Sequence, residues 1–286
     1  MSTTLKQMDR YFVPTPSPYP ILLSAALFLL SIGAVFRLDA LGPGLWLLGG
    51  GAGLLLYVLF HWFGRVIDES ETGIYAPWED RSFRLGMIWF IASEVVFFGA
   101  LFGILFYERE ISVPWLASFS QRFTPWPGFT AQWPSAGPKG HVFTPMSAWG
   151  IPAVNTLLLL SSGVTITSAH AWFLKGRREA ASWGVLLTVL LGVLFLFLQA
   201  REFYHAYTVL GLTLHSGVYG ATFFLLTGFH GLHVTVGVIM LSTLFVRLRK
   251  GHFSAEHMFA FEAVSWYWHF VDVVWLMLYV FVYWLR

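Results

Sequence analysis

Cysteine is absent from this sequence, and charged residues are scarce. Because none of the 286 residues is a cysteine, disulfides, iron–sulfur clusters, cysteine nucleophiles and thiolate-bound zinc or copper are excluded. Charged residues make up only 11% of the chain, whereas soluble domains carry about a quarter. So few polar side chains could not cover the surface of a soluble fold. The 57% content of hydrophobic residues therefore predicts an integral membrane protein.

Long apolar segments predict an all-α fold with seven transmembrane helices, because about 20 apolar residues are needed to cross the hydrocarbon core. We expect these helices at about residues 18–36, 45–63, 83–107, 147–173, 181–203, 214–248 and 255–285. No cleavage pattern follows the first apolar run, so we expect that run to be retained. Glycines at 49–53 in the second helix would allow another helix backbone to approach closely.

Lys and Arg residues gather in short clusters between the apolar runs, and these clusters predict the orientation. The clearest clusters follow the fourth and sixth helices, at 175–178 and 247–250, on the same side as the N-terminus. Since positive residues concentrate in cytoplasmic loops, we expect a cytoplasmic N-terminus and a periplasmic C-terminus. The prediction is a multi-pass protein of the bacterial inner membrane. No basic run is long enough to indicate a nucleic-acid partner.

The predicted helices divide the chain into three parts. Residues 1–63 hold an N-terminal lead-in and the first two helices, residues 64–82 form a cytoplasmic connection, and residues 83–286 form a five-helix bundle. This bundle includes a long periplasmic loop at 108–147. Its prolines are expected to exclude a continuous helix, and its tryptophans favour a position at the headgroup level or against a partner.

A few ionisable side chains fall at membrane depth, where their cost makes them candidates for function. They are Glu94 in the third predicted helix, His230 and His233 in the sixth, and Glu262, His269 and Asp272 in the seventh. Carboxylates and imidazoles of this kind can bind a metal. However, a single His-x-x-His pair is a weak signal, and the repeated Glu-x-x-His of di-iron bundles is absent. We therefore predict no metal site. The alternative is that these groups satisfy one another, with Glu94 neutral or bonded to a histidine of the sixth helix.

Basic and aromatic residues at the inner helix ends form a candidate site for a phospholipid headgroup. Trp62, Arg65 and Glu69 mark the inner end of the second helix, and Arg247 marks that of the sixth. Basic pockets between helices on the cytoplasmic side bind anionic headgroups. Simple anchoring of helix ends in the membrane is the alternative, and the sequence favours neither.

Motifs from about the second helix onward keep a recognisable order and spacing. The seventh helix carries Trp-Tyr-Trp-His-Phe-Val-Asp-Val-Val-Trp at 266–275, preceded by Phe-Glu-Ala at 261–263. The sixth carries Gly-Val-Tyr-Gly at 217–220 and Gly-Phe-His-Gly-Leu-His at 228–233. The remaining matches are Ser93-Glu94-Val95, Phe97-Phe98, Pro152, Asn155, Thr156, Ser162-Gly163, Leu198-Gln199-Ala200, Glu202 and Tyr204. Together these motifs resemble subunit III of the haem-copper cytochrome c oxidases.

This resemblance implies a two-helix and a five-helix bundle separated by a V-shaped lipid cleft. It implies a non-catalytic core subunit of a proton-pumping terminal oxidase that passes electrons from cytochrome c to oxygen. Haem and copper would then lie in partner subunits and not in this chain. The chain would pack against subunit I, with subunit II in the same complex, bind phospholipid and support proton uptake. The family tends to place an Arg just before the residue corresponding to Glu69, whereas this chain has Asp68.

Two alternatives stay open at this point. A free-standing proton-coupled transporter would use the intramembrane Glu and His residues as a relay, but no inverted repeat or broken helix is detectable. Subunit III of a quinol oxidase is the second alternative. The two N-terminal helices argue against it, because those relatives typically have five helices.

Overall fold

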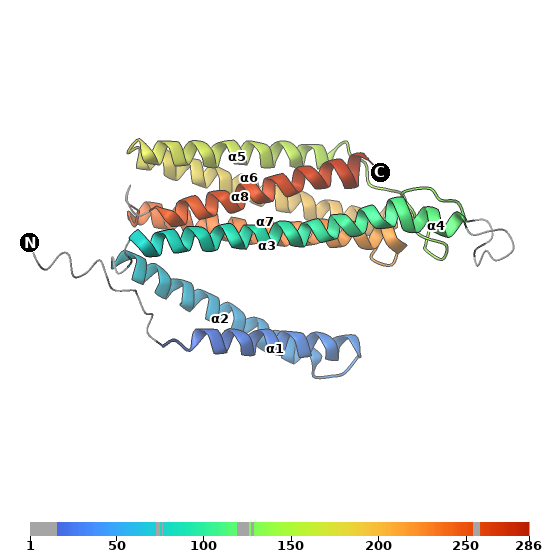
Figure 1. The fold of residues 1–286 in the computed structure, drawn as a ribbon, viewed down its shortest axis with the longest axis horizontal. Coiled ribbons are helices and arrows are strands. Elements are labelled where there is room, and N and C mark those ends of the chain that lie inside the picture. The colour runs from blue at the N-terminus through green and yellow to red at the C-terminus, as the bar shows by residue number, and fades with distance from the viewer. Residues whose placement is uncertain are drawn as a thin grey trace, which may run out of the picture. The chain divides into compact units, whose positions relative to one another are not determined.

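The computed structural model of the protein describes residues 16–72, 75, 77–118, 126, 129–253 and 258–285, and these residues form helices and irregular segments without any strand. The chain divides into two compact units, Met1–Phe83 and Arg84–Arg286. Figure 1 labels the helices in chain order.

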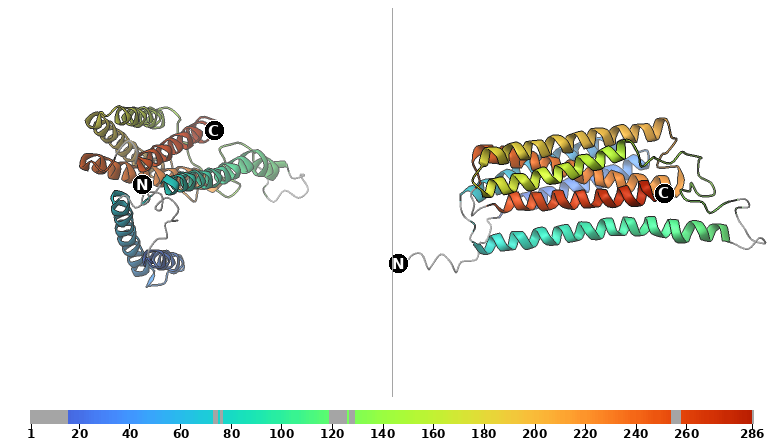
Figure 2. Two further views of the ribbon diagram at one scale, coloured as in Figure 1. Left: turned by 60° about the vertical axis from the view of Figure 1, so that its left-hand side comes forward. Right: turned by 90° about the horizontal axis from the view of Figure 1, so that it is seen from above.

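The first unit is built on a hairpin of two helices, α1 (Tyr19–Leu38) and α2 (Gly44–Glu71), which run side by side (Figure 2). A Cβ atom added at Gly51 would lie 2.9 Å from the backbone nitrogen of Leu30, and one added at Gly33 would lie 2.7 Å from that of Leu48. Only glycine allows the two backbones to come this close. The predicted close approach at the 49–53 glycines is therefore confirmed at Gly51.

The second unit contains a closed ring of four helices: α5 (Ile151–Leu174), α6 (Arg178–Thr208), α7 (Gly217–Lys250) and α8 (Phe259–Leu278), which a π-helical segment, Tyr279–Trp284, extends. Each of these helices packs on the next, and α8 packs on α5, as the parallel ribbons of Figures 1 and 2 show. The helix α3 (Pro77–Tyr107) begins in the first unit, and from Arg84 onward it belongs to the second, in which it packs through aromatic side chains. Its pairs are Phe97–Phe229, Phe98–Phe270 and Phe102–Phe281.

Seven helical segments of the described residues are long and apolar enough to cross a membrane. They are Tyr19–Leu38, Gly44–Glu71, Trp78–Ala117, Ile151–Leu174, Arg178–Thr208, Gly217–Lys250 and Phe259–Trp284. A helix satisfies every backbone hydrogen bond within itself, which the bilayer core demands. The predicted class, an all-α membrane protein with seven spans, is confirmed.

The helices around the expected connection extend beyond their apolar runs. Residues through Glu71 continue α2, and α3 already begins at Pro77, so most of the expected connection at 64–82 is helical. Hydropathy marks the part of a helix that lies in lipid, and a polar turn can continue the helix beyond it. Here Arg65 and Glu69 form an ion pair four residues apart, which supports such a turn.

The loop expected at 108–147 is not one continuous helix in its described residues, but a helix covers its first part. The helix continues from α3 through a π-helical turn, Glu108–Ser112, into α4 (Val113–Ser118), which contains Pro114. In an α-helix the proline ring would clash with the carbonyl group four residues earlier. The wider π-helical turn directly before Pro114, in which the Val113 N–H reaches the Glu108 carbonyl, relieves that constraint.

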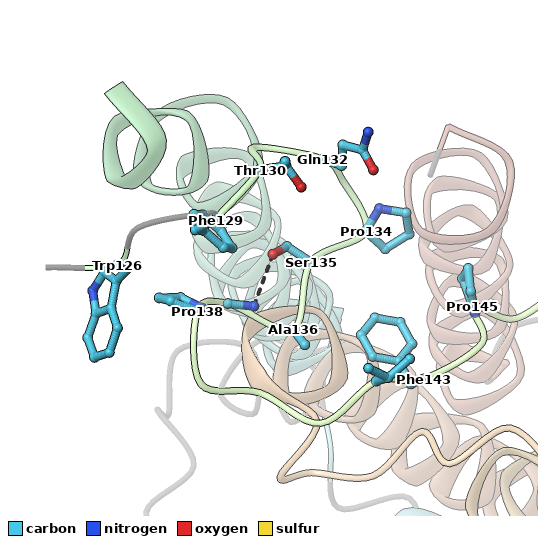
Figure 3. A pocket seen from close by; sticks show the side chains of 12 residues that line it. Trp126, Phe129, Thr130, Gln132, Pro134, Ser135, Ala136, Pro138, Phe143 and Pro145 are labelled. Carbon is cyan, nitrogen blue, oxygen red and sulfur yellow. Dashed lines mark hydrogen bonds between the residues drawn. The ribbon is translucent and has the colours of Figure 1, made fainter. Parts of the chain in front are cut away.

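The described part of the loop after α4 packs onto the start of α7. The Tyr219 ring stacks on Phe143 with the two ring planes 1° apart, and it also contacts Trp133. The Tyr219 N–H donates to the Ser135 carbonyl over 3.2 Å. A pocket of about 530 Å³ opens in this loop, and Trp126, Phe129, Pro138 and Phe143 are among the residues that line it (Figure 3).

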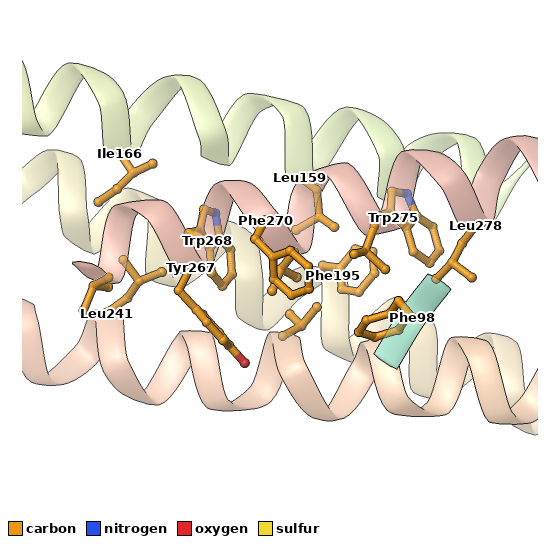
Figure 4. Close-up of a cluster of buried hydrophobic side chains, with 14 of the residues drawn as sticks. Phe98, Leu159, Ile166, Phe195, Leu241, Tyr267, Trp268, Phe270, Trp275 and Leu278 are labelled. Atoms are coloured by element: carbon orange, nitrogen blue, oxygen red, sulfur yellow. The ribbon is translucent and has the colours of Figure 1, made fainter. Parts of the chain in front are cut away.

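The indole of Trp268 lies at the centre of the four-helix ring (Figure 4). Its Nε1–H donates to the Ser162 hydroxyl on α5 over 2.8 Å. A Cβ atom added at Gly192 on α6 would lie 2.7 Å from the indole, and one added at Gly237 on α7 would lie 2.8 Å from it. One side chain of α8 therefore touches all three other helices of the ring, and two of those contacts require glycine.

Replacing Gly237 by Val should destabilise this ring, because the indole is held on three sides and cannot move aside. Overpacking of a core typically costs about 1–3 kcal/mol. The matched control is Gly228→Val on the same helix, where an added Cβ meets nothing within 4 Å. The apparent unfolding temperature in detergent should fall for Gly237→Val and stay near wild type for the control. Equal shifts in both variants would contradict the packing described here.

Candidate functional site

Glu94 on α3 and His233 on α7 form a close polar contact at membrane depth. The Glu94 Oε2 atom lies 2.9 Å from His233 Nε2. The other ring nitrogen, Nδ1, lies 2.7 Å from the Phe229 carbonyl oxygen. Since a carbonyl only accepts, Nδ1 carries a proton and Nε2 faces the carboxyl group. The prediction that Glu94 bonds to a histidine of this helix is confirmed.

One proton lies between the Glu94 carboxyl group and the His233 ring. If the proton is on Glu94, the acid donates to a neutral imidazole, and if it is on His233, an imidazolium donates to a carboxylate. Both states are neutral overall, which keeps the cost of an ionisable pair in a membrane low. The proton can therefore move between the two groups without leaving an unpaired charge, whereas its loss from the pair would leave a carboxylate without a counter-charge.

Aromatic rings enclose the His233 side chain. Phe97 and Tyr267 stack on its imidazole, and Phe98 meets it edge to face. The Tyr267 hydroxyl donates to the His233 carbonyl over 3.2 Å. The side chains of Glu94 and His233 are only 21% and 14% exposed. The rings restrict access of water to the shared proton.

His230 points to a different neighbour, although it lies one turn before His233. Its side chain is completely buried, and its Nε2 lies 3.2 Å from the Val271 carbonyl oxygen on α8. The rings of Phe195 and Trp275 cover it. The two histidines therefore have different partners, because α8 meets His230 while α3 meets His233. In the described ranges, no group of three or more His, Cys, Asp or Glu residues could hold a metal ion.

The polar residues of α8 make separate contacts. Glu262 forms an ion pair with Arg84 of α3. His269 instead lies 3.7 Å from Asp272 and places its Nε2 3.1 Å from the Thr167 hydroxyl on α5. The predicted network of Glu262, His269 and Asp272 thus separates into two parts. Seven residues of helix put about 10 Å between Glu262 and His269, which is beyond side-chain reach.

The candidate headgroup residues of α2 are already in contact with groups of the first unit. Arg65 Nε lies 3.3 Å from Glu69 Oε1, and the Tyr75 hydroxyl donates to Glu69 Oε2 over 2.8 Å. Burial raises the pKa of Tyr75 to about 12, and the hydrogen bond to Glu69 adds to the rise. Trp62 stacks on Tyr19 with ring centroids 6.0 Å apart. Glu69 is therefore held between a cation and a phenol that stays protonated.

Arg247, the other candidate for headgroup binding, lies in the second unit. Its guanidinium group sits 4.6 Å from the centre of the Phe253 ring. Arg178, at the start of α6, donates to the Phe253 carbonyl over 2.7 Å. Phe253 thus joins two arginines at the adjoining ends of α6 and α7, which is a basic surface of the kind that binds anionic headgroups.

A buried polar cluster in the second unit was missed by the sequence analysis. It contains Asn155 on α5, Gln199 and Glu202 on α6, and Tyr283 beyond α8. Asn155 Nδ2 donates to Gln199 Oε1 over 3.5 Å, and the Tyr283 hydroxyl faces Glu202 and Gln199. Both Glu202 carboxyl oxygens are buried, and no described group lies in hydrogen-bond geometry with either of them. The available signal was the pair of polar residues three apart within an apolar helix.

Comparison with known proteins matches the chain over almost its full length. The family model described as cytochrome c oxidase subunit III matches residues 9–286. Proteins named cytochrome c oxidase subunit 3 from Tetraodon nigroviridis and Cyprinus carpio are each 40% identical to the chain over 279 residues. The protein of that name from Loxodonta africana is 39% identical over 279 residues. Each alignment covers 97% of this chain and 98% of the relative.

Glu94→Gln should leave the folded protein nearly as stable as wild type, because the amide can donate to His233 Nε2 in place of the acid. Glu94→Leu should destabilise it by about 1–3 kcal/mol, since it leaves a largely buried ring nitrogen without a hydrogen bond. Apparent unfolding temperatures of both variants in detergent test this difference. If the Gln variant unfolds as readily as the Leu variant, the hydrogen bond does not stabilise the fold.

Proposed function

The chain belongs to the cytochrome c oxidase subunit III family, and we propose that it stabilises the catalytic subunit, binds phospholipid and supports proton uptake. It is a multi-pass membrane subunit of a terminal oxidase, a proton-translocating oxidoreductase. The observation that carries the proposal is the enclosed, proton-sharing contact between Glu94 and His233. This contact offers a proton-holding group at membrane depth without offering a redox centre.

In this proposal, haem and copper lie in partner subunits. Subunit I packs directly on this chain, and subunit II belongs to the same complex. Several ionisable residues at membrane depth support this arrangement, because other side chains or a backbone group already engage them. Glu94 is paired with His233, Glu262 with Arg84, and His230 with a backbone carbonyl.

Membership of this family decides against a free-standing proton-coupled transporter. The seven spans also argue against a quinol oxidase, because subunit III of those oxidases typically has five helices. We therefore retain the cytochrome c oxidase as the proposed complex.

Phospholipid binding is proposed at the basic helix ends, with Trp62, Arg65 and Glu69 on α2 and Arg247 on α7. Arg65 is partly exposed beside Glu69, and Arg247 belongs to a surface that also contains Arg178. Cationic groups at the membrane surface attract anionic headgroups. The proposal includes the V-shaped lipid cleft between the two-helix and five-helix bundles.

The proposed orientation places the N-terminus in the cytoplasm and the C-terminus in the periplasm of a bacterial inner membrane. It rests on the basic residues in the last turn of α7, namely Arg247, Arg249 and Lys250. Basic residues also lie between α5 and α6, at the same side of the bundle. Positive residues concentrate on the cytoplasmic side of membrane proteins.

The assembled oxidase carrying Glu94→Gln should contain normal haem and copper and begin turnover at nearly the wild-type rate. Its activity should then decay faster during continuous turnover, because the proton-holding pair has lost its acid. Oxygen consumption recorded over many turnovers measures both quantities. The matched control is Glu179→Gln, the same change at an exposed position in the first turn of α6. Loss of oxygen reduction from the first turnover with normal haem and copper would contradict the supporting role, since Glu94 would then take part in the chemistry.

Arg65→Gln should lower the amount of anionic phospholipid that co-purifies with the complex, because it removes a cation at the inner end of α2. Mass spectrometry of lipid extracted from the purified complex provides the measurement. Arg37→Gln, at the opposite end of the hairpin in the last turn of α1, is the control and should retain wild-type lipid. Equal lipid content in the wild type and in both variants would argue that Arg65 only anchors the helix.

A further inference from the structure

One histidine of the second unit lies on its exposed face at membrane depth, beside a buried aspartate. His269 is near the middle of the apolar span Phe259–Trp284, and its side chain is 45% exposed. The side chain of its neighbour Asp272 is only 8% exposed. By contrast, aromatic rings enclose the side chain of His233. The His269 side chain therefore faces the molecules that surround α8.

The contacts of this pair determine its hydrogen-bonding state. The Thr167 hydroxyl donates to the Gly163 carbonyl over 2.8 Å, so it accepts a hydrogen bond from His269 Nε2. The remaining nitrogen, Nδ1, faces Asp272 Oδ2 at 3.7 Å, which is longer than a hydrogen bond. His269 Nδ1 thus keeps hydrogen-bonding capacity that the chain itself does not use well.

Gly163 shows that the two helices are shaped around this pair. A Cβ atom added at Gly163 would lie 2.6 Å from Asp272 Oδ2 and 3.6 Å from the His269 ring. Because Gly163 of α5 has no side chain, there is room beside it for the polar groups of α8. One polar site therefore lies where α5 and α8 meet, and it consists of Gly163, Thr167, His269 and Asp272.

The surroundings of the site are apolar and exposed. Leu160 and Val164 precede Thr167 along one face of α5, while Val273 and Met277 follow His269 along one face of α8. Lipid tails could cover the aliphatic residues but could not satisfy an imidazole. Ionisable residues in membranes face protein or water-filled cavities, and polar side chains between helices form hydrogen bonds that join them.

We propose that the α5–α8 face around His269 is the surface on which a transmembrane helix of a partner subunit docks, with a hydroxyl or amide side chain directed at His269. The occupant's polar group is uncharged, because a charge at membrane depth is costly. A hydroxyl or an amide can also bond to His269 Nδ1 whether or not that nitrogen carries a proton. This inference rests on the proposed function, which places the chain in a complex with membrane-spanning partners.

Single-cysteine crosslinking tests the docking face, since the natural chain contains no cysteine. A photoactivated crosslinker is attached to the cysteine of the Val273→Cys or Val164→Cys variant in the assembled, haem-bearing complex. Both should form adducts with a membrane-spanning segment of a partner subunit. The matched control is Leu190→Cys on α6, which lies across the ring from α8 and is also exposed. It should form adducts mainly with lipid.

Two results would overturn the docking surface. One is that Val273→Cys and Val164→Cys react only with lipid or with the first unit of this same chain while the complex is intact. The other is that Leu190→Cys gives the partner adducts instead. Failure of the proposed function has a different signature, because the chain would then purify without any haem-bearing subunit.

Substitutions of His269 test the polar contribution. His269→Leu should lower the fraction of the chain that stays with the complex through detergent purification several-fold, whereas His269→Gln should largely preserve it. Retention of the Leu variant at the wild-type level would overturn the role of the hydrogen bond. The crosslinking result stays decisive if His269→Leu fails to fold, because those cysteine variants keep His269.

Discussion

The insertion of Trp268 between the helices is the contact on which the second unit depends. The indole is large and completely buried, and the bilayer supplies no hydrophobic force to hold helices together. Close packing and interhelical hydrogen bonds must therefore do so. Gly192 and Gly237 let α6 and α7 approach the indole, and the Ser162 hydroxyl on α5 accepts a hydrogen bond from the indole N–H. Four helices are fixed around one side chain.

The same ring determines where each polar residue of α7 and α8 points. Once Trp268 is fixed, Trp275 lies two turns further along α8, donates to Thr156 over 3.0 Å and covers His230. His233 is rotated toward α3 and meets Glu94. The two histidines of one motif therefore serve different purposes: one is a packed core residue and the other shares a proton.

Polar groups at membrane depth are distributed as separate pairs rather than as one site. Glu262–Arg84 joins the end of α3 to α8, and Glu94–His233 joins the middle of α3 to α7. The helix α3 otherwise meets α7 and α8 mainly through aromatic side chains, so these two polar contacts fix its position along the bundle. His269, which lies beside the buried Asp272, differs because its side chain is 45% exposed.

The sequence by itself determined the membrane class, the seven spans and the family, because apolar length and motif order are local properties of the chain. It also placed Glu94 beside a histidine of α7, since both fall at similar depths. It did not determine which histidine that would be, nor that Glu262 belongs with Arg84. Those contacts depend on how far each helix is rotated about its axis, and packing between helices decides that. Trp268, Gly192 and Gly237 set these rotations, and nothing in the pattern of apolar residues distinguishes these three from their neighbours. The helical course through Pro114 was likewise decided by the turn geometry before it, which a count of prolines does not reveal.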